Sequence, residues 1–392
     1  MRKARKAGFL GAAALAVALL FAAKGALAAG LVDFGSPADP WKKEVLQFFA
    51  GKEEKLRFFQ LGDSHTAADF FSGVMRERLQ AEYGDGGIGY ITPARVSGNR
   101  LARVTFSQSG VTVVTNRSDE NDYALGGVSA FLDEEGGTVT VNPRPEELGP
   151  ERALFFVRTN GAEMPISISD ATGSRDLPAD PDSPNWQGAQ IPVRLPFTYS
   201  TLPGGAWEVG GIYLENGARG AVYSASGLNG AQFSQTDRWG EGWTHELALL
   251  RPQLLILSFG TNEAFYPKYD GAAFRAFWKE AIDRIRADAP GTGILIVGAS
   301  ESLRSTAGAC GTRPVALDDV QAAQLEIARE KGTLYWSWQE AQGGPCSMKG
   351  WIEAKKGRRD GVHFTAGGYS ELAGGLASDL ISLLNSLKGK QE

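Results

Sequence analysis

The stretch Leu61-Gly62-Asp63-Ser64-His65-Thr66 lies between two segments of different character. The apolar run 56–61 before it is typical of a buried strand. The segment 67–83 after it has apolar residues at helical spacing, and Gly84 is a helix stop signal. A serine at a strand-to-helix turn stands clear of the sheet, beside the unpaired N–H groups of the helix start. This turn suits a nucleophile whose reaction develops an oxyanion; the alternative is a residue that only caps the helix.

Two distant stretches supply side chains that fit a serine nucleophile. The apolar run 254–259 predicts a buried strand, so Asn262 falls where open α/β sheets present ligand groups. Near the C-terminus, Asp360 and His363 are three residues apart and precede another helix-like segment. The carboxylate can orient the imidazole and leave its other nitrogen for the serine. We therefore predict a catalytic triad of Ser64, Asp360 and His363.

Four blocks together resemble the SGNH (GDSL-type) esterase superfamily: Gly62-Asp63-Ser64, Gly230 within 227–231, Gly260-Thr261-Asn262, and Asp360 with His363. The longer motifs are similar to those of bacterial peptidoglycan O-acetylesterases: Gly-Asp-Ser-His-Thr-Ala at 62–67, Gly-Asp-Gly-Gly-Ile-Gly at 84–89, Gly-Thr-Asn-Glu-Ala at 260–264 and Asp-Gly-Val-His-Phe-Thr at 360–365. The resemblance covers roughly 55–94 and 217–385. One small departure is Ala68, where the family usually has glycine, and it affects no catalytic role.

The resemblance implies acyl transfer through Ser64, with His363 as the base. The sequence itself gives no sign of an organic cofactor. The oxyanion would receive the backbone N–H of Ser64, the N–H of Gly230 and the side-chain amide of Asn262; Gly227 is the alternative to Gly230. The implied reaction removes O-acetyl groups from the muramoyl C6 hydroxyl of peptidoglycan. Two alternatives remain open: an O-acetyltransferase acting on peptidoglycan or an exopolysaccharide, and a non-catalytic glycan-binding protein on an esterase scaffold.

Three neighbours of these residues have simpler interpretations. His65 adjoins the serine, but a chain neighbour usually points elsewhere, and no acid is placed to orient it. We expect Asp63 to hold the turn rather than to react. Glu263 is expected to be a loop or cleft-wall residue.

The order of predicted elements indicates an α/β fold with an inserted all-β domain. Strands and helices alternate in 29–94 and 216–392, which predicts a parallel sheet flanked by helices, as in SGNH hydrolases. The region 95–215 shows short alternating runs separated by turn clusters, a β-sandwich pattern. The resemblance implies a carbohydrate-binding jelly roll there. Among the helices, 67–83, 271–288 and 366–387 are predicted as continuous segments.

Residues 1–28 are predicted to be a secretory signal peptide. Basic residues near the start precede the apolar run 7–23, and Ala26-Leu27-Ala28 fits a small-x-small cleavage site. The alternative is an uncleaved anchor. Cleavage would place the mature protein in the periplasm, in the cell envelope or outside the cell, with no membrane span.

Charge and cysteine content limit the partners. Removal of residues 1–28 takes away five of 40 basic residues and none of the 45 acidic ones, which leaves a net charge near −10. This acidic balance, with no basic block, argues against nucleic acid or an anionic membrane as partner. Cys310 and Cys346 both fall in predicted loops, and an exported protein favours a disulfide between them over two buried thiols. The three histidines form no metal-binding pattern with them.

Overall fold

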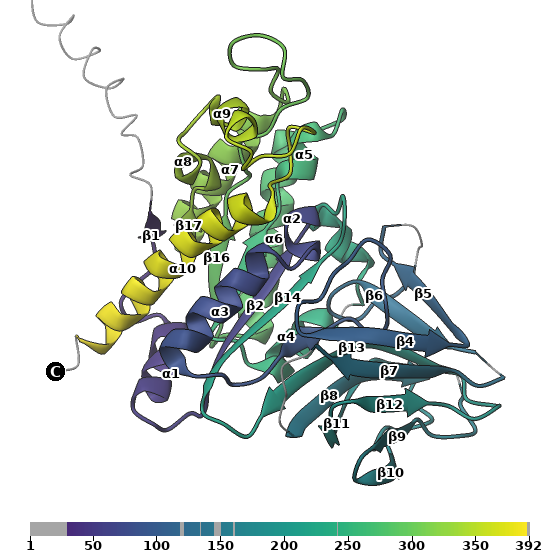
Figure 1. Ribbon diagram of the computed structural model, residues 1–392. Helices are drawn as coiled ribbons and strands as arrows, with labels where there is room; N and C mark the ends of the chain where they lie inside the picture. Colours follow the sequence, from purple (N-terminus) through teal and green to yellow (C-terminus); the bar gives the residue numbers. More distant parts are fainter. Residues whose placement is uncertain are drawn as a thin grey trace, which may run out of the picture.

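The computed structural model describes residues 30–117, 121–133, 135–144, 150–159, 161–240 and 242–389. The predicted signal peptide at 1–28 lies outside these residues. Figure 1 shows two parts side by side: helices packed around one sheet, and a group of antiparallel strands. None of the helices that the structure describes is long and apolar enough to cross a membrane.

The first part is built on a six-stranded sheet in the order β1-β17-β16-β15-β2-β14. Strands β17 to β14 run parallel, and β1 joins the edge antiparallel to β17. The alternation of strands and helices along the chain produces this arrangement, since parallel neighbours need a crossover. The strands are β1 Leu31–Asp33, β2 Lys55–Gly62, β14 Gly220–Gly227, β15 Leu254–Ser258, β16 Gly293–Val297 and β17 Leu334–Trp336.

Helices cover both faces of this sheet. Helices α1, α3 and α10 share a buried cluster with one face, and α4, α6 and α7 share another with the opposite face. Strand β2 alternates accordingly: Phe58 belongs to the first cluster and Phe59 to the second. The helices are α1 Pro40–Phe49, α2 Ser64–Ala67, α3 Phe71–Tyr83, the 3-10 helix η1 Phe233–Arg238, α4 Trp243–Leu250, α5 Thr261–Phe265, α6 Gly271–Asp288, α7 Leu317–Lys331, α8 Trp338–Ala341, α9 Ser347–Glu353 and α10 Ala366–Lys388.

The second part consists of two antiparallel sheets around a core of their own. Period-two burial is clearest in β11, where Ala189, Ile191 and Val193 are buried between exposed neighbours. One sheet runs β10 Gly173–Asp176, β9 Ser167–Asp170, β12 Phe197–Ser200, β7 Thr138–Pro143 and β4 Val104–Ser109. The other runs β11 Gln187–Arg194, β8 Pro150–Thr159, β13 Trp207–Asn216, β6 Val128–Leu132 and β5 Val111–Thr115, with β3 Gly89–Ile91 also paired to β13.

The two parts share buried contacts. One apolar cluster contains Phe59 of β2 together with Tyr123 and Tyr213 of the antiparallel part. Tyr90 in β3 donates its hydroxyl to the carbonyls of Leu125 at 2.8 Å and Gly210 at 3.0 Å. These contacts fix the antiparallel sheets against the parallel one, so residues from both can line one site.

The observed sheets confirm the predicted fold class. Helix α6 has the predicted bounds, and α10 extends one residue beyond its prediction. The continuous helix predicted over 67–83 is wrong at its start, because α2 ends at Ala67 and α3 begins at Phe71. Asp69 interrupts it with a φ of +51°, and its carboxylate accepts hydrogen bonds from Ser72 Oγ and from the N–H of Ala102. The domain bounds 29–94, 95–215 and 216–392 stay a prediction.

Candidate active site

Ser64 stands at the carboxyl end of strand β2, which lies between β15 and the edge strand β14. The strand ends at Gly62 and α2 begins at Ser64, with Asp63 Oδ1 accepting the N–H of His65 at 2.9 Å. A Cβ at Gly62 would lie 2.2 Å from Thr66 Oγ1 and 2.8 Å from the carbonyl oxygen of Ser258. Only glycine therefore lets the chain turn this tightly beneath the serine. Asp63 caps the turn, as expected from the sequence.

The structure brings Ser64, His363 and Asp360 into line. Ser64 Oγ lies 2.8 Å from His363 Nε2, and His363 Nδ1 lies 2.9 Å from Asp360 Oδ2. Both partners remain open to solvent, with 35% of the His363 side chain and 46% of the Asp360 side chain exposed. A nucleophile, a base and a group that orients the base are thus connected by hydrogen bonds at a site that substrate can reach.

Backbone groups hold the Asp360 carboxylate in its ionised form. Its Oδ1 accepts the N–H groups of Val362 and His363, each at 2.9 Å. Partial burial acts to raise the pKa of Asp360, but these two hydrogen bonds, with that of the His363 ring, hold it below its ordinary value. An ionised carboxylate is what fixes a proton on Nδ1 and leaves Nε2 free to accept one.

The loop that carries Asp360 and His363 is attached to the segment after β16. Leu303 donates its N–H to the carbonyl of Gly361 at 2.8 Å. Gly361 has a φ of +75°, and a Cβ there would lie 2.8 Å from the Leu303 carbonyl oxygen. Within the loop, Arg358 donates its N–H to the carbonyl of His363 at 2.7 Å. The position of the imidazole therefore depends on the segment that follows residue 300.

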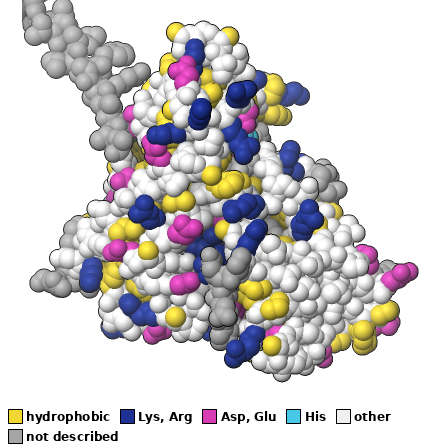
Figure 2. Space-filling view, in the orientation of Figure 1, with side chains coloured by type: hydrophobic (Ala, Val, Ile, Leu, Met, Phe, Trp, Pro, Cys, Tyr) yellow, Lys and Arg dark blue, Asp and Glu magenta, His cyan; other side chains and the backbone are white. Residues whose placement is uncertain are grey.

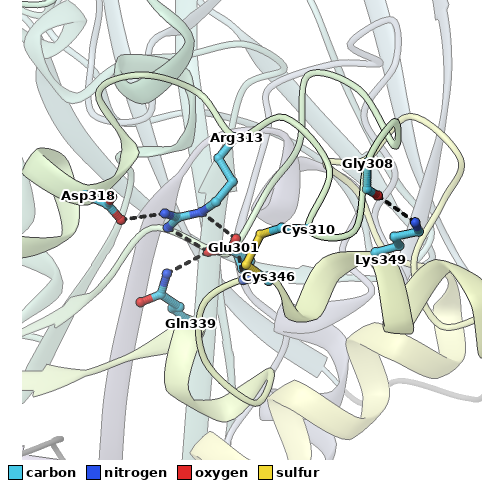
Figure 3. The surroundings of a disulfide bond; sticks show 8 residues. All are labelled: Glu301, Gly308, Cys310, Arg313, Asp318, Gln339, Cys346 and Lys349. Atoms are coloured by element: carbon cyan, nitrogen blue, oxygen red, sulfur yellow. Dashed lines mark hydrogen bonds and ion pairs between the residues drawn. A yellow bond between two sulfur atoms is a disulfide. The ribbon is translucent and has the colours of Figure 1, made fainter.

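A disulfide between Cys310 and Cys346 anchors that segment, in agreement with the pairing favoured by the sequence (Figure 3). Beside it Glu301, which is fully buried, accepts Arg313 Nε at 2.6 Å and Gln339 Nε2 at 2.6 Å. The same carboxylate accepts the N–H of Cys346 at 3.0 Å. The disulfide and the buried ion pair therefore brace the same stretch of chain.

We expect the double variant Cys310→Ser/Cys346→Ser to lose about 3–4 kcal/mol of unfolding free energy. The two cysteines are 36 residues apart, and a cross-link over that span restricts the unfolded chain by about this amount. Urea unfolding followed by tryptophan fluorescence measures the change. Wild-type protein unfolded in the presence of a reductant is the control and should match the double variant. A loss below about 1 kcal/mol in both would contradict the expectation.

Gly230 and Asn262 lie against the Ser64 turn. The loop after β14 is attached to that turn through the Leu228 N–H, which donates to the Gly62 carbonyl at 3.2 Å. Gly230 has a φ of +75°, and no acceptor for its N–H is present among the described residues. Asn262 Nδ2 donates to the Ala231 carbonyl at 2.8 Å and to Asp63 Oδ2 at 3.3 Å. The longer of these two bonds is the one that an incoming oxyanion can replace.

Gly227, the alternative to Gly230, has a packing role. A Cβ at Gly227 would lie 2.6 Å from the Ala67 nitrogen and 2.7 Å from the Asp63 carbonyl oxygen. The end of β14 can therefore approach α2 closely only because residue 227 is glycine. This contact leaves Gly230 as the better placed donor of the two.

Glu263 lines a hollow of about 340 Å³, in keeping with the wall residue expected from the sequence, and it also braces the site. It is buried, and its Oε1 accepts the N–H of Phe233 at 2.8 Å. Its Oε2 accepts the N–H of Gly260 at 3.0 Å. One carboxylate thus ties the Asn262 turn to the helix that follows Gly230. The bond to Gly260 is the half of a capping box that a glutamate at the third helical position supplies, and glycine has no side chain to make the other half. No local sequence pattern predicts the bond to Phe233.

We expect Glu263→Gln to lower kcat on acetate esters by about tenfold or more. The NH₂ of the glutamine amide would face one of the two backbone N–H groups and cannot accept a hydrogen bond from it. The loss of that bond displaces Asn262 or Gly230. Initial rates on a small acetate ester measure the effect. Glu77→Gln, an exposed substitution on α3, is the matched control. Unchanged kcat in Glu263→Gln would show that the brace does not position the site.

The same variant should change how stability depends on pH. Burial raises the pKa of Glu263 to about 7 from its ordinary 4.5, against the hydrogen bonds it accepts. The folded state then binds the Glu263 proton more tightly than the unfolded state does. The contribution of Glu263 to the free energy of unfolding is therefore present below pH 4.5 and is lost as the pH rises through about 7. Urea unfolding at several pH values should show wild-type stability falling relative to Glu263→Gln over that interval. A pH-independent difference would contradict the assignment.

His65 is placed away from the role of base. Its Nδ1 lies 2.9 Å from the Tyr369 hydroxyl, and its ring packs 5.3 Å from that of His363, centroid to centroid. Burial and then the neighbouring His363 lower the pKa of His65 to about 3, so it stays neutral at ordinary pH. This geometry agrees with the expectation that the His65 side chain does not serve as the base for Ser64.

Two family models match the sequence in adjoining segments. The model described as "Peptidoglycan O-acetylesterase, N-terminal" matches residues 86–198. The GDSL-like lipase/acylhydrolase model matches residues 203–370, which include Gly230, Asn262, Asp360 and His363 but not Ser64. None of the curated proteins matches this sequence.

Solved structures are also similar. A peptidoglycan O-acetylesterase is 39% identical, with a TM-score of 0.84, over 91% of this chain and 99% of that one. A putative GDSL-like lipase from Parabacteroides merdae is 17% identical, with a TM-score of 0.34, over 41% of this chain and 72% of that one. A carbohydrate-binding module of Cellvibrio mixtus lichenase 5A, solved with cellotriose, is 18% identical, with a TM-score of 0.21, over 28% and 89% respectively.

Proposed function

The chain belongs to the peptidoglycan O-acetylesterase family of SGNH (GDSL-type) acylhydrolases, and from this membership we propose that it hydrolyses O-acetyl groups on the muramoyl C6 hydroxyl of peptidoglycan. The observation that carries the proposal is the line of hydrogen bonds Ser64–His363–Asp360, at 2.8 Å and 2.9 Å. The 39% identical relative supports the substrate class.

Acylation begins when Ser64 Oγ attacks the carbonyl carbon of the acetyl ester. His363 Nε2 accepts the serine proton, and Asp360 stabilises the imidazolium through Nδ1–H. The tetrahedral intermediate then breaks its bond to the sugar oxygen, which takes the proton from His363. The deacetylated hydroxyl leaves, and acetyl-Ser64 remains.

The negative charge of the intermediate is directed toward three donors. We assign these to the backbone N–H of Ser64, the N–H of Gly230 and Asn262 Nδ2–H. Asn262 Nδ2 donates to Asp63 Oδ2 only at 3.3 Å, so this hydrogen bond can be exchanged for one to the oxyanion at small cost. Water then attacks acetyl-Ser64, with His363 as its base, and acetate and free Ser64 result.

The proposal includes location and domain limits. We propose that residues 1–28 are a cleaved signal peptide and that the mature enzyme acts in the periplasm or elsewhere in the cell envelope. The disulfide Cys310–Cys346 supports an oxidising compartment. We also propose the hydrolase segments 29–94 and 216–392 around a β-sandwich insertion at 95–215.

Acetate release from O-acetylated peptidoglycan tests the proposed reaction. The mature protein is incubated with this substrate, with a glycan acceptor present in half of the tubes. The esterase predicts free acetate in amounts that do not depend on the acceptor. Acetyl groups on the acceptor with little free acetate would make the protein a transferase. Turnover of small acetate esters alone would keep the mechanism and reject the substrate.

A further inference from the structure

A hollow of about 320 Å³ opens where the segment after β3 meets β4 and the end of β7. Its lining includes the side chains of Arg95, Arg100 and Arg144, with Phe106 as an aromatic surface. Among the described residues no carboxylate lines it. We call it the arginine hollow. Figure 2 shows Lys and Arg side chains gathering on this face between the helical part and the antiparallel sheets.

Within the described part of the chain, the three guanidinium groups have few partners. Arg100 lies over the Phe70 ring, 4.9 Å from its centroid. Arg144 donates from Nη2 to the Leu101 carbonyl at 3.3 Å, while its Nε is buried without a partner in the described part of the chain. Asp69, an acid near the hollow's wall, is already paired with another arginine at 3.2 Å. Planar donors that no described carboxylate pairs with are suited to an external carboxylate.

The wall of the hollow is attached to the candidate active site. Arg100 donates its N–H to the carbonyl of Ala67, the last residue of α2, at 3.0 Å. Asn99 Nδ2 donates to the Gly227 carbonyl at 2.9 Å, at the start of the Gly230 loop. Helix α2 is one turn long, so the hollow begins within roughly 10 Å of Ser64. About three extended residues span that distance.

We propose that the arginine hollow binds a free carboxylate of the stem peptide attached to the muramoyl residue being deacetylated. The inference rests on the proposed function and adds which part of the substrate is recognised. The glycan backbone of peptidoglycan is neutral, so three cations beside Ser64 have no counter-charge in the sugar chain. The stem peptide hangs from the same muramoyl residue and carries carboxylates. Phe106 offers an apolar surface to its side chains.

The inference predicts a preference for glycan whose stem peptides carry free carboxylates. O-acetylated glycan strands are prepared with stem peptides, and in a matched portion the peptide carboxylates are converted to methylamides with a carbodiimide and methylamine. The ratio of kcat/KM for the two substrates is the readout. Because both substrates are hydrolysed at the same serine, this ratio does not depend on how much of the protein is folded. Wild-type enzyme should favour the strands with free peptide carboxylates by about tenfold or more, and less so at high salt.

The variant Arg95→Gln/Arg144→Gln should bring this ratio close to one. Arg78→Gln, an exposed arginine on α3, is the matched control and should keep the wild-type ratio. A ratio near one in the wild type, or a high ratio that the double variant leaves unchanged, would overturn the inference. Absence of acetate from both strands, with small esters still hydrolysed, would reject the proposed substrate and the inference with it.

Discussion

Replacement of Ser64 by alanine is expected to lower acetate release from O-acetylated peptidoglycan by about 10³-fold or more. Without Oγ no acetyl-enzyme forms, and the oxyanion donors and His363 can assist only a direct attack by water. The substitution removes one atom whose partner, His363 Nε2, lies in a solvent-accessible side chain. The protein should therefore keep its fold.

Initial acetate release, measured by an enzyme-coupled assay, gives the size of the effect. Ser378→Ala, an exposed substitution on α10, is the matched control and should keep wild-type activity. Circular dichroism and thermal unfolding of both variants should match the wild type. Near-normal turnover by folded Ser64→Ala protein would reject Ser64 as the nucleophile.

Asp360→Asn should cost about 10³- to 10⁴-fold in kcat with little change in folding. The asparagine oxygen can still accept the N–H groups of Val362 and His363, as Asp360 Oδ1 does. Its amide nitrogen, however, would face His363 Nδ1 as a donor. The imidazole would then carry its proton on Nε2, the nitrogen that has to accept the proton of the serine.

Initial rates on a small acetate ester measure the loss. Asp182→Asn, an exposed substitution, is the matched control and should keep the wild-type kcat. A loss smaller than about tenfold in Asp360→Asn would argue that another group orients His363.

Much of the α/β part was predictable because its elements are long and locally determined. Helix 271–288 shows a regular apolar face, and the run at 56–61 is flanked by clear turn signals. The alternation of such segments implies the parallel sheet. The short strands β3, β10 and β12 were not predicted as separate elements, since three or four residues carry too little periodicity. Strands β3 and β12 pair with the distant strands β13 and β7, whereas β10 pairs with β9, the strand directly before it.

In the candidate site, too, local contacts were predictable and contacts between distant segments were not. Asp360 and His363 are close in the sequence, so their contact was predictable from local spacing. Their distance from Ser64 depends on the whole sheet and on the Leu303–Gly361 contact. The bond from Phe233 to Glu263 joins two segments 30 residues apart, and no local pattern indicates it. Asp69 breaks the predicted helix because its carboxylate is held by a partner 33 residues away.

The central claim is that Ser64 carries the acetyl group, and a serine-directed organophosphonate tests it most directly. The protein is treated for increasing times, and each sample is assayed for acetate release from O-acetylated peptidoglycan and mapped by peptide mass spectrometry. The account predicts one adduct, on Ser64, and activity that falls in proportion to the fraction modified. Full acetate release from protein modified at Ser64, or inactivation with the adduct on another residue, would contradict it.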